Sequence, residues 1–266
     1  MTTRRRLDAE LVRRGLARSR EHAASLVTAR RVLVAGQAAA KPATQVAPGD
    51  PITITGAAGE PDYASRGGQK LAGALAAFPA LRVEGRRCLD AGASTGGFTD
   101  VLLRAGAAHV IAVDVGYGQL AWALRTDERV TVLDRVNVRE LRPEQVAPAP
   151  DLVTADLSFI SLGLVLPALI ACASPDADFV LLVKPQFEVG KERVGSGGVV
   201  RDPELRREAV AAVAAAAGAR GLGVAGVVAS PLPGPAGNVE YFLWLRRGAP
   251  PLREDELRRA VEEGPQ

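Results

Sequence analysis

The sequence has few cysteines, few histidines and no long apolar run. Its two cysteines, Cys88 and Cys172, cannot form a disulfide framework and do not have the spacing of metal ligands. Both lie in apolar sequence, so we expect unreactive packing residues. The lack of a disulfide framework favours a reducing cytoplasm, and the lack of a ligand cluster predicts that the protein holds no metal.

The longest strongly apolar stretch, residues 162–173, is shorter than the roughly 20 residues that a membrane-spanning helix needs. The amino-terminal sequence MTTRRRLDAE has acids directly after its arginines and no apolar core, so it does not resemble a secretory signal. A hydrophobic fraction of 47% argues against disorder, because that much apolar surface collapses. We therefore expect a water-soluble globular protein with no membrane partner, of one large or two unequal domains.

Positive charge is concentrated at the amino end of the chain. Residues 1–31 contain nine arginines and three acids, a net charge of +6, whereas the whole chain carries +3, so the remainder carries −3. A basic segment joined to a mildly acidic body is typical of a polyanion-binding appendage. Charge alone leaves open the alternative of a solvated, arginine-rich helix face.

The amino-terminal segment predicts two helices. Gly15 can end the first helix, and Ser19 can cap the second. We expect the second helix to end in Arg30 and Arg31, because cations favour the negative end of the helix dipole.

Short apolar runs at residues 32–34 and 52–54 predict strands that complete this small unit. The sequence GAAGEPDYASR that follows has no periodicity, which indicates a linker. We place the two domains at residues 1–58 and 67–266, joined by a linker over residues 59–66.

After the linker, buried-strand patterns alternate with amphipathic or alanine-rich helix patterns. This alternation predicts a parallel sheet covered by helices on both faces, as in doubly wound α/β folds. Ligands of such sheets bind outside the carboxyl ends of the strands. Charged residues end five of the apolar runs: Asp90, Asp114, Asp134, Asp156 and Lys184.

The sequence LDAGASTGGF, residues 89–98, predicts a strand, a glycine-rich loop and the start of a helix. Glycines let the backbone approach a ligand closely, and the start of a helix offers N–H donors. The spacing G-x-x-x-G-G differs from the dinucleotide fingerprint G-x-G-x-x-G, which disfavours an NAD-dependent enzyme. A plain tight turn remains the alternative for the loop alone.

Two acids near this loop favour S-adenosylmethionine as the ligand. Asp114 lies 24 residues after Asp90, a distance suited to an acid that binds ribose hydroxyls. A carboxylate at Asp90 suits a ligand that carries a sulfonium and an amino group. Asp90 could instead bond backbone amides at the end of its strand.

A second set of charged residues consists of two lysines and two acids. A buried-strand pattern that ends in a lysine is unusual, because an ammonium group is hardly ever buried without partners. Clustered cations can also lower the pKa of a lysine, which makes it a usable base for a hydroxyl. Ordinary exposed charges are the alternative for each residue alone. The four residues are Lys70, Asp156, Lys184 and Glu240.

The whole chain resembles the TlyA family, which joins an S4-type RNA-binding domain to a methyltransferase domain like that of the FtsJ/RrmJ ribose 2′-O-methyltransferases. The S4 pattern matches RLDAELVRRGLARSREHAASLV and RVLVAGQ. The methyltransferase motifs match, in order, SRGGQKL, LDAGASTGGFTD, DVGYGQLAW, DLSFISL, LVKPQFE and SPLPGPAGNVEYFLWL. The resemblance implies a small α+β S4 domain followed by a doubly wound, Rossmann-like α/β domain of the class I methyltransferases.

The resemblance also implies a role for each matched residue. The catalytic Lys–Asp–Lys–Glu tetrad corresponds to Lys70, Asp156, Lys184 and Glu240. The residues expected to bind S-adenosylmethionine are Asp90, Gly92, Ala93, Ser94, Gly96, Gly97, Phe98, Asp114, Asp134, Asn137 and Asp156. The residues expected to bind RNA phosphates are Arg4, Arg5, Arg6, Arg14, Arg18, Arg20, Arg30 and Arg31.

The implied activity is methyl transfer from S-adenosylmethionine to the 2′-hydroxyl of a cytidine in ribosomal RNA. The complete basic amino end and a helical tail over residues 253–263 resemble the longer form that modifies both 16S and 23S RNA, with an influence on sensitivity to tuberactinomycin antibiotics. We expect a cytoplasmic monomer whose partners are ribosomal subunits. Two alternatives remain: a non-catalytic RNA-binding or assembly factor, and a membrane-active haemolysin.

Overall fold

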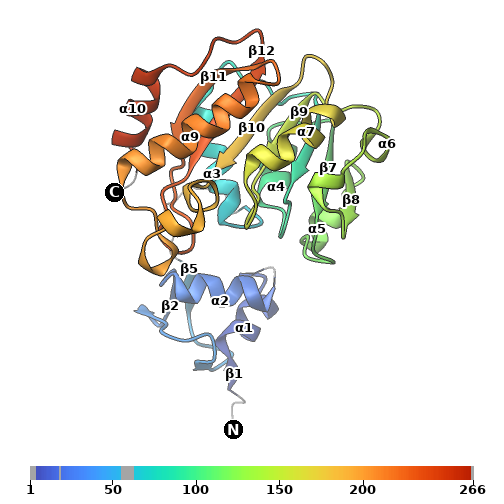
Figure 1. Cartoon of the computed structure of the whole chain (residues 1–266). Helices are drawn as coiled ribbons and strands as arrows, with labels where there is room; N and C mark the ends of the chain where they lie inside the picture. Colours follow the sequence, from blue (N-terminus) through green and yellow to red (C-terminus); the bar gives the residue numbers. More distant parts are fainter. Residues whose placement is uncertain (1–3, 18, 55–62, 265–266) are drawn as a thin grey trace. The chain divides into compact units, whose positions relative to one another are not determined.

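The computed structural model describes residues 4–17, 19–54 and 63–264 (Figure 1). The chain divides into two compact units, Met1–Pro61 and Asp62–Gln266. The expected linker over residues 59–66 lies partly outside the described residues. Its last two positions belong to a helix, since Arg66 begins α3 and Ser65 caps it by accepting a hydrogen bond from the Gly67 N–H.

The amino-terminal unit contains two helices and short strands around its own small core. The predicted cap is present, because the Ser19 side chain accepts a hydrogen bond from the His22 N–H at 3.1 Å. Leu7, Leu11 and Val27 are almost fully buried. The elements of this unit are β1 (Arg5–Arg6), α1 (Leu7–Arg13), α2 (Arg20–Thr28), β2 (Val32–Val34), β3 (Gln37–Ala38), β4 (Gln45–Val46) and β5 (Ile52–Ile54).

The end of the second helix differs from the prediction. Helix α2 ends at Thr28, and Arg30 adopts a left-handed conformation with φ of 58°. A left-handed residue cannot continue a right-handed helix. Arg30 and Arg31 therefore lie after the helix rather than in its last turn.

The second unit is built on a seven-stranded sheet with the order β11-β12-β10-β9-β6-β7-β8. Strands β6, β7, β8, β9 and β10 are parallel, which confirms the alternating strand and helix pattern. The strands are β6 (Arg87–Ala91), β7 (His109–Asp114), β8 (Val130–Asp134), β9 (Leu152–Ala155), β10 (Asp178–Val183), β11 (Leu222–Ala229) and β12 (Tyr241–Arg247).

The last strand departs from the expected parallel sheet. Strand β12 is antiparallel to both neighbours, β10 and β11. Residues 230–240 connect β11 to β12 without a helix, so the chain returns directly beside the strand that it has left. As a result, β12 begins at the edge where β10 ends.

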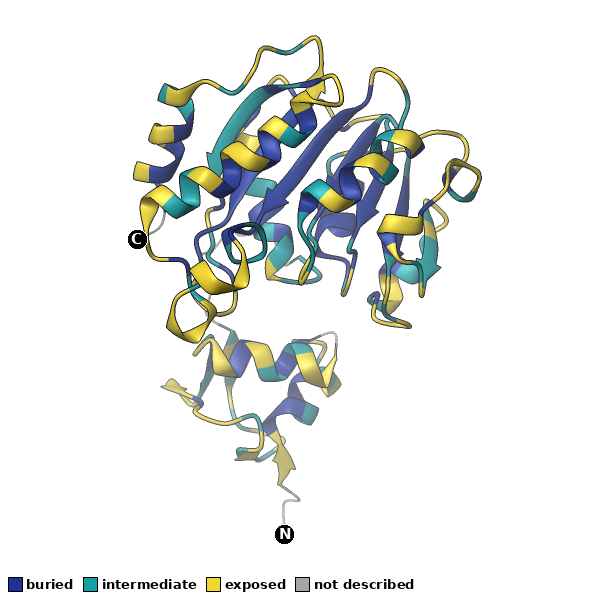
Figure 2. Cartoon of the chain, in the orientation of Figure 1, coloured by how far each residue is buried: buried dark blue, intermediate teal, exposed yellow. Residues whose placement is uncertain are grey.

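Helices cover both faces of the sheet, as a doubly wound fold requires. Buried residues of α7 and α9 pack on one face, and buried residues of α3 and α4 pack on the other. Figure 2 shows buried strands between helices that are exposed on their outer sides. The helices are α3 (Arg66–Ala77), α4 (Gly97–Arg104), α5 (Trp122–Arg125), α6 (Pro143–Val146), α7 (Leu162–Cys172), α8 (Pro185–Glu188), α9 (Pro203–Gly218) and α10 (Glu254–Glu262), with single turns η1 (Val138–Glu140), η2 (Lys191–Arg193) and η3 (Ser196–Gly198).

Both cysteines are buried and free. Burial raises the pKa of Cys88 to about 12 and that of Cys172 to about 11. Thiols in this state are poor nucleophiles, so the predicted packing role is confirmed.

Candidate active site

Neighbouring strands bring the predicted catalytic residues to one edge of the sheet. In the strand registers, Ala155 pairs with Leu181, and Val183 pairs with Tyr241. Asp156 and Lys184 directly follow their strands. Glu240 directly precedes β12, and because β12 runs in the reverse direction, it lies at the same edge.

Two ion pairs join the four side chains. Lys70 Nζ lies 2.5 Å from Glu240 Oε2, and Lys184 Nζ lies 2.6 Å from Asp156 Oδ1. Lys70, Lys184 and Glu240 are buried. Removing one partner of a buried ion pair typically costs about 3–5 kcal/mol, because it leaves an uncompensated charge. Each pair therefore holds its lysine at a defined position.

The two ion pairs lie close to one another through helix α3. A β-carbon added at Gly67 would lie 3.8 Å from Asp156 Oδ2. Lys70 is one helical turn beyond Gly67, on the same side of α3. Helix α3 therefore connects the Lys70–Glu240 pair to the Lys184–Asp156 pair.

The glycine-rich loop is more than a tight turn. Gly92 has φ of +86°, and a β-carbon added to it would lie 2.5 Å from the Asp156 carbonyl oxygen. A β-carbon at Gly97 would collide with Ser65 Oγ at the start of α3. The loop therefore packs directly against the segments that carry Asp156 and Lys70. Only glycine allows this approach.

Asp90 is buried inside β6, beneath the loop. Its Oδ2 accepts a hydrogen bond from the Thr99 hydroxyl at 2.7 Å. Its Oδ1 is buried and has no hydrogen-bond donor among the described residues. Burial raises the pKa of Asp90 to about 7. A buried carboxylate oxygen without a donor is the kind of group that a cationic ligand can satisfy.

Asp114 organises the other side of the loop. Its two carboxylate oxygens accept hydrogen bonds from the Ser94 N–H at 2.8 Å and the Gly116 N–H at 2.7 Å. An ionised carboxylate has about four acceptor positions, so two remain for ribose hydroxyls.

The next two predicted residues bond to the protein. Asp134 Oδ2 forms an ion pair with Arg125 at 2.9 Å. The Asn137 side chain caps η1 by accepting a hydrogen bond from the Arg139 N–H at 3.1 Å. The amide nitrogen of Asn137 and the second acceptor position of its oxygen remain for a ligand.

The sequence analysis missed a group of residues beside Lys184. The Ser158 hydroxyl accepts a hydrogen bond from Lys184 Nζ at 3.0 Å. Phe159 is 91% exposed, has φ of 64° and packs against Phe187 with ring centroids 5.2 Å apart. An exposed aromatic with a left-handed backbone is a rare combination that often marks a functional site. The only signal for Phe159 in the sequence is that it lies in the segment that follows strand β9.

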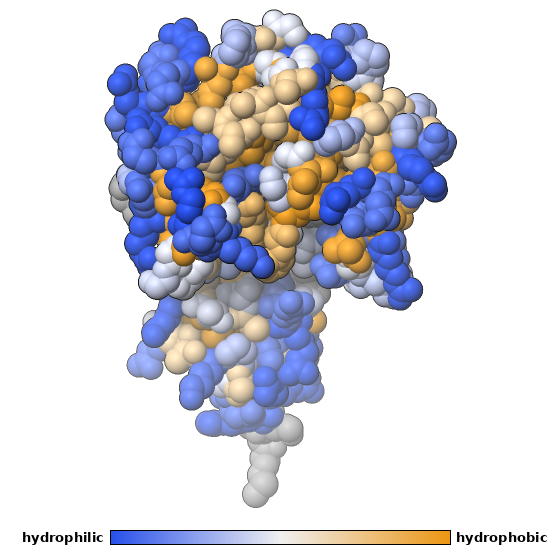
Figure 3. All heavy atoms as spheres, in the orientation of Figure 1, coloured by the Kyte–Doolittle hydropathy of each residue, from blue (hydrophilic) through white to orange (hydrophobic). Residues whose placement is uncertain are grey.

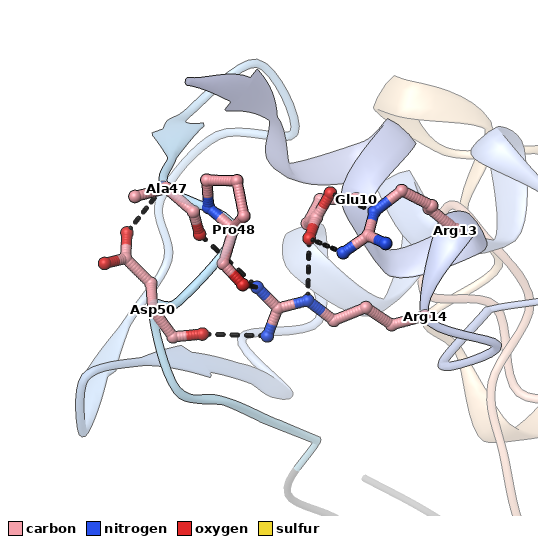
Figure 4. Close-up of polar contacts among 6 residues, drawn as sticks. All are labelled: Glu10, Arg13, Arg14, Ala47, Pro48 and Asp50. Atoms are coloured by element: carbon pink, nitrogen blue, oxygen red, sulfur yellow. Dashed lines mark hydrogen bonds and ion pairs between the residues drawn. The ribbon is translucent and has the colours of Figure 1, made fainter. Parts of the chain in front are cut away.

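The predicted RNA-binding arginines differ in their contacts. Arg14 donates hydrogen bonds to Glu10 and to the carbonyls of Ala47, Pro48 and Asp50, which gives it a structural role (Figure 4). Binding of RNA by Arg14 stays a prediction. A phosphate would have to compete with these hydrogen bonds for the guanidinium.

Two more of these arginines share an acid. Arg6 and Arg20 both form ion pairs with Asp8. Arg4, Arg5 and Arg30 are exposed. Hydrophilic residues cover most of the face of this unit visible in Figure 3. Arg18 lies outside the described residues.

No helix in the described part of the chain is long and apolar enough to span a membrane. The haemolysin alternative therefore gains no spanning helix from residues 4–17, 19–54 and 63–264.

Comparisons with known proteins match both units. Residues 63–247 match the model of the FtsJ-like methyltransferases, and residues 5–52 match the S4 domain.

The names of several relatives refer to methylation of rRNA or to hemolysin. The chain is 61% identical to the 16S/23S rRNA (cytidine-2′-O)-methyltransferase TlyA of Mycobacterium tuberculosis, over 100% of both chains. It is 35% identical to the 23S rRNA (cytidine-2′-O)-methyltransferase TlyA of Campylobacter jejuni, over 68% of this chain and 70% of that one. A solved structure of a hemolysin-like protein from Streptococcus thermophilus superposes with a TM-score of 0.77 at 38% identity, over 99% of this chain and 96% of that one. The chain therefore belongs to the TlyA family of FtsJ-like methyltransferases.

Proposed function

We propose that this protein transfers a methyl group from S-adenosylmethionine to the 2′-hydroxyl of a cytidine in ribosomal RNA. The observation that carries the proposal is the presence of two ion pairs, the buried Lys70–Glu240 and the partly buried Lys184–Asp156, at the strand ends beside the glycine-rich loop. The relatives from M. tuberculosis and C. jejuni, both named rRNA (cytidine-2′-O)-methyltransferases, support the choice of cytidine and of ribosomal RNA.

The loop and its two acids fit S-adenosylmethionine. Gly92 and Gly97 let the loop pack directly against the segments that carry Asp156 and Lys70, and Asp90 Oδ1 offers an acceptor to a cationic ligand. Asp114 keeps acceptor positions for ribose hydroxyls. We assign these residues to the donor site, together with Ala93, Ser94, Gly96, Phe98, Asp134, Asn137 and Asp156.

The choice of lysine at the site supports a role in proton transfer. The chain contains only four lysines, Lys41, Lys70, Lys184 and Lys191, among 33 basic residues. Arginine cannot lose its proton in a protein, whereas lysine can. Two of the four lysines nevertheless occupy the two buried ion pairs, where a guanidinium would supply charge equally well. We infer that the site requires an amine that can be deprotonated.

In the proposed mechanism, Lys184 receives the proton of the ribose hydroxyl. S-adenosylmethionine supplies the methyl group as an electrophile when it is bound. Bound S-adenosylmethionine would give its methyl group to the hydroxyl oxygen and leave as the neutral thioether. The hydroxyl proton would pass to the Lys184 amine, once this has released the proton that it carries in the ion pair with Asp156. Asp156 and Ser158 hold the amine in place. Lys70 and Glu240 orient the ribose, and the rate depends mainly on alignment and local charge.

The amino-terminal unit is proposed to supply affinity for RNA through phosphate contacts. It contains no Phe, Tyr or Trp, so His22 has the one aromatic ring that this unit could stack on a base. Its exposed arginines give binding that depends on salt but not on sequence. Action on both 16S and 23S RNA, and an influence on tuberactinomycin sensitivity, are part of the proposal. The name of the M. tuberculosis relative and the helix α10 support the former.

A methyl-transfer assay tests the proposal. The purified protein is incubated with methyl-labelled S-adenosylmethionine and with 30S subunits, 50S subunits or free rRNA from cells that lack this modification. Labelled 2′-O-methylcytidine in digested RNA is the expected result, and Lys184→Ala should abolish it while binding of S-adenosylmethionine stays within about threefold. Lys191→Ala, which removes an exposed lysine of η2, is the matched control.

The outcomes separate the alternatives. Binding of subunits with no label in any RNA would identify a non-catalytic assembly factor. Labelling of a base, or full activity of Lys184→Ala, would overturn the assignment of the reaction or of its base. Lysis of vesicles by the pure protein would revive the haemolysin alternative.

A further inference from the structure

Two loops carry the Lys184–Asp156 ion pair, and the sheet does not hold them together. We define the aspartate loop as residues 156–161, after β9, and the lysine loop as residues 184–189, after β10. The hydrogen-bonded register between these strands ends at Ala155 and Leu181. Beyond this point, side-chain contacts must fix one loop against the other.

Three contacts join the two loops. Nearest the sheet, Lys184 donates a hydrogen bond to the Ser158 hydroxyl at 3.0 Å. Further out, the rings of Phe159 and Phe187 pack at 5.2 Å. At the far end, Glu188 bonds to the start of helix α7.

The Glu188 contact consists of two hydrogen bonds accepted by one side chain. Glu188 Oε2 accepts a hydrogen bond from the Ser161 hydroxyl at 2.6 Å, and Oε1 accepts one from the Leu162 N–H at 2.9 Å. Ser161 is the cap of α7 and also accepts a bond from the Gly163 N–H. Burial raises the pKa of Glu188, and the two bonds that it accepts at the start of the eleven-residue helix α7 oppose this effect by favouring the carboxylate.

The short helix α8 transmits this contact to Lys184. Lys184 is the residue that precedes α8, and Glu188 is the last residue of that helix. The Phe187 N–H donates to the Lys184 carbonyl at 2.9 Å, and the Val189 N–H donates to the Pro185 carbonyl at 3.1 Å. The turn between Lys184 and Glu188 is therefore closed by its own hydrogen bonds, so its two ends move together.

We propose that Glu188 is a positioning residue for methyl transfer: by tying the lysine loop to the start of α7, it fixes Lys184 against Asp156. The inference rests on the proposed function, because it assumes that Lys184 acts on the ribose hydroxyl. Glu188 is proposed to act through Lys184 and not by touching a reactant. Its partners are Ser161 and Leu162, which lie on the aspartate-loop side.

The test compares Glu188→Ala with Glu188→Gln. Alanine removes both acceptors, and kcat should fall about 10- to 100-fold, since a misplacement of about 1 Å can have an effect of this size. Glutamine keeps the length of the side chain and one carbonyl acceptor, so kcat should recover to within about threefold of the wild type. The Kd for S-adenosylmethionine and the KM for RNA should change less than twofold in both variants. If Glu188 had only a structural role, Glu188→Ala would change kcat and the two constants alike, and Glu188→Gln would not restore kcat.

Two further variants keep the test decisive. Ser161→Ala removes one of the two donors, so it should lower kcat by a smaller factor, and it carries the test if Glu188→Ala does not fold. In the double variant Ser161→Ala/Glu188→Ala, the loss should match that of Glu188→Ala alone, because both changes break the same contact. Glu192→Ala, an exposed acid of η2, is the matched control and should keep full kcat.

Lys184→Ala, assayed in parallel, separates the two proposals. An inactive Lys184→Ala beside a Glu188→Ala and a Ser161→Ala with wild-type kcat would overturn the positioning role and leave the proposed function intact. An active Lys184→Ala would overturn the proposed mechanism itself. Equal losses in kcat and in binding of S-adenosylmethionine for Glu188→Ala would also overturn the positioning role.

Discussion

The two units use ion pairs for different purposes. In the amino-terminal unit, the paired acids Asp8 and Glu10 are buried and their arginine partners reach the surface: Glu10 lies beneath Arg13 and Arg14. The adjacent guanidinium of Arg13, followed by that of Arg14, lowers the pKa of Glu10 to about 2. These charges do not change near neutral pH. They form a fixed basic surface.

In the methyltransferase unit, both partners of each site ion pair lie within the fold, and the cation is a lysine. All 11 aromatic residues of the chain belong to this unit, and Tyr117, Trp122 and Phe159 are among the exposed ones. The comparison separates a unit suited to phosphates from a unit suited to bases and to proton transfer. The type of cation, arginine or lysine, follows this division.

Exchanging lysine for arginine in one unit, and arginine for lysine in the other, tests this division most directly. Lys184→Arg keeps the positive charge but cannot release a proton near neutral pH, so methyl transfer should fall at least about 1000-fold. Arg13→Lys in the other unit keeps its surface charge, and activity should stay within about twofold. Single-turnover rates measured on the same subunit preparation compare the two variants. Substantial activity of Lys184→Arg would mean that Lys184 supplies charge rather than a base.

The buried acid Asp90 predicts a pH effect confined to the methyltransferase unit. Its pKa of about 7 lies above the ordinary value of an aspartate, so the folded state keeps a proton that the unfolded state releases. The raised pKa of Asp90 stabilises the folded state at low pH. This contribution to the free energy of unfolding is lost as the pH rises through about 7. Relative to Asp90→Asn, the wild-type free energy of unfolding should fall on the order of 3 kcal/mol between pH 5 and pH 8.

Urea unfolding followed by tryptophan fluorescence measures this effect, because Trp122 and Trp244 both belong to this unit. Excess S-adenosylmethionine should reduce the pH dependence, since a cationic ligand favours ionised Asp90. A pH profile identical in wild type and Asp90→Asn would contradict the raised pKa.

The glycine-rich loop predicts a loss of donor binding. In Gly92→Ala, the new methyl group meets both an unfavourable φ and the Asp156 carbonyl at 2.5 Å. The Kd for S-adenosylmethionine, measured by calorimetry, should rise about 100-fold, with a loss of stability of about 2–3 kcal/mol. Gly85→Ala is the control, because Gly85 has φ of +74° but no atom within 4 Å of the added carbon. It should lose only about 1–2 kcal/mol, with normal donor binding.

The smallest effect is expected for the basic surface. Replacing Arg4 and Arg5 with alanine should weaken binding of ribosomal subunits several-fold and lower the slope of log K against log[salt] by about 1–2. The value of kcat at saturating subunits should not change. Arg220→Ala, in the other unit, is the control. A change in kcat without a change in salt slope would place these arginines in the chemistry rather than in affinity.

Regular elements were predictable from the sequence, whereas pairings between distant segments were not. The apolar runs before Asp114, Asp156 and Lys184 are long enough to identify strands, and these strands form as predicted. The direction of β12 was not predictable, because a run of apolar residues does not reveal whether a hairpin or a crossover precedes it. The two-residue strands β1, β3 and β4 were missed, since two residues cannot display a period.

The prediction of the site was limited in the same way, because contacts between distant segments leave no pattern in the sequence. Strand ends in a parallel sheet meet at one edge, so the proximity of Asp156 and Lys184 follows from the pattern. The bond between Ser161 and Glu188 links residues 27 positions apart through two loops, and no periodicity connects them. The role of Arg14 as a bridge to three carbonyls was equally invisible.

The reversed direction of β12 also bears on synthesis of the chain. Lys70 becomes available early, but its partner Glu240 lies 170 positions later and reaches the site only when the final strand inserts between β10 and β11. A nascent chain still lacking that strand holds Lys70 and Lys184 without their full complement of acids. In the proposed mechanism, Lys70 therefore gains its partner acid only after β12 has been synthesised.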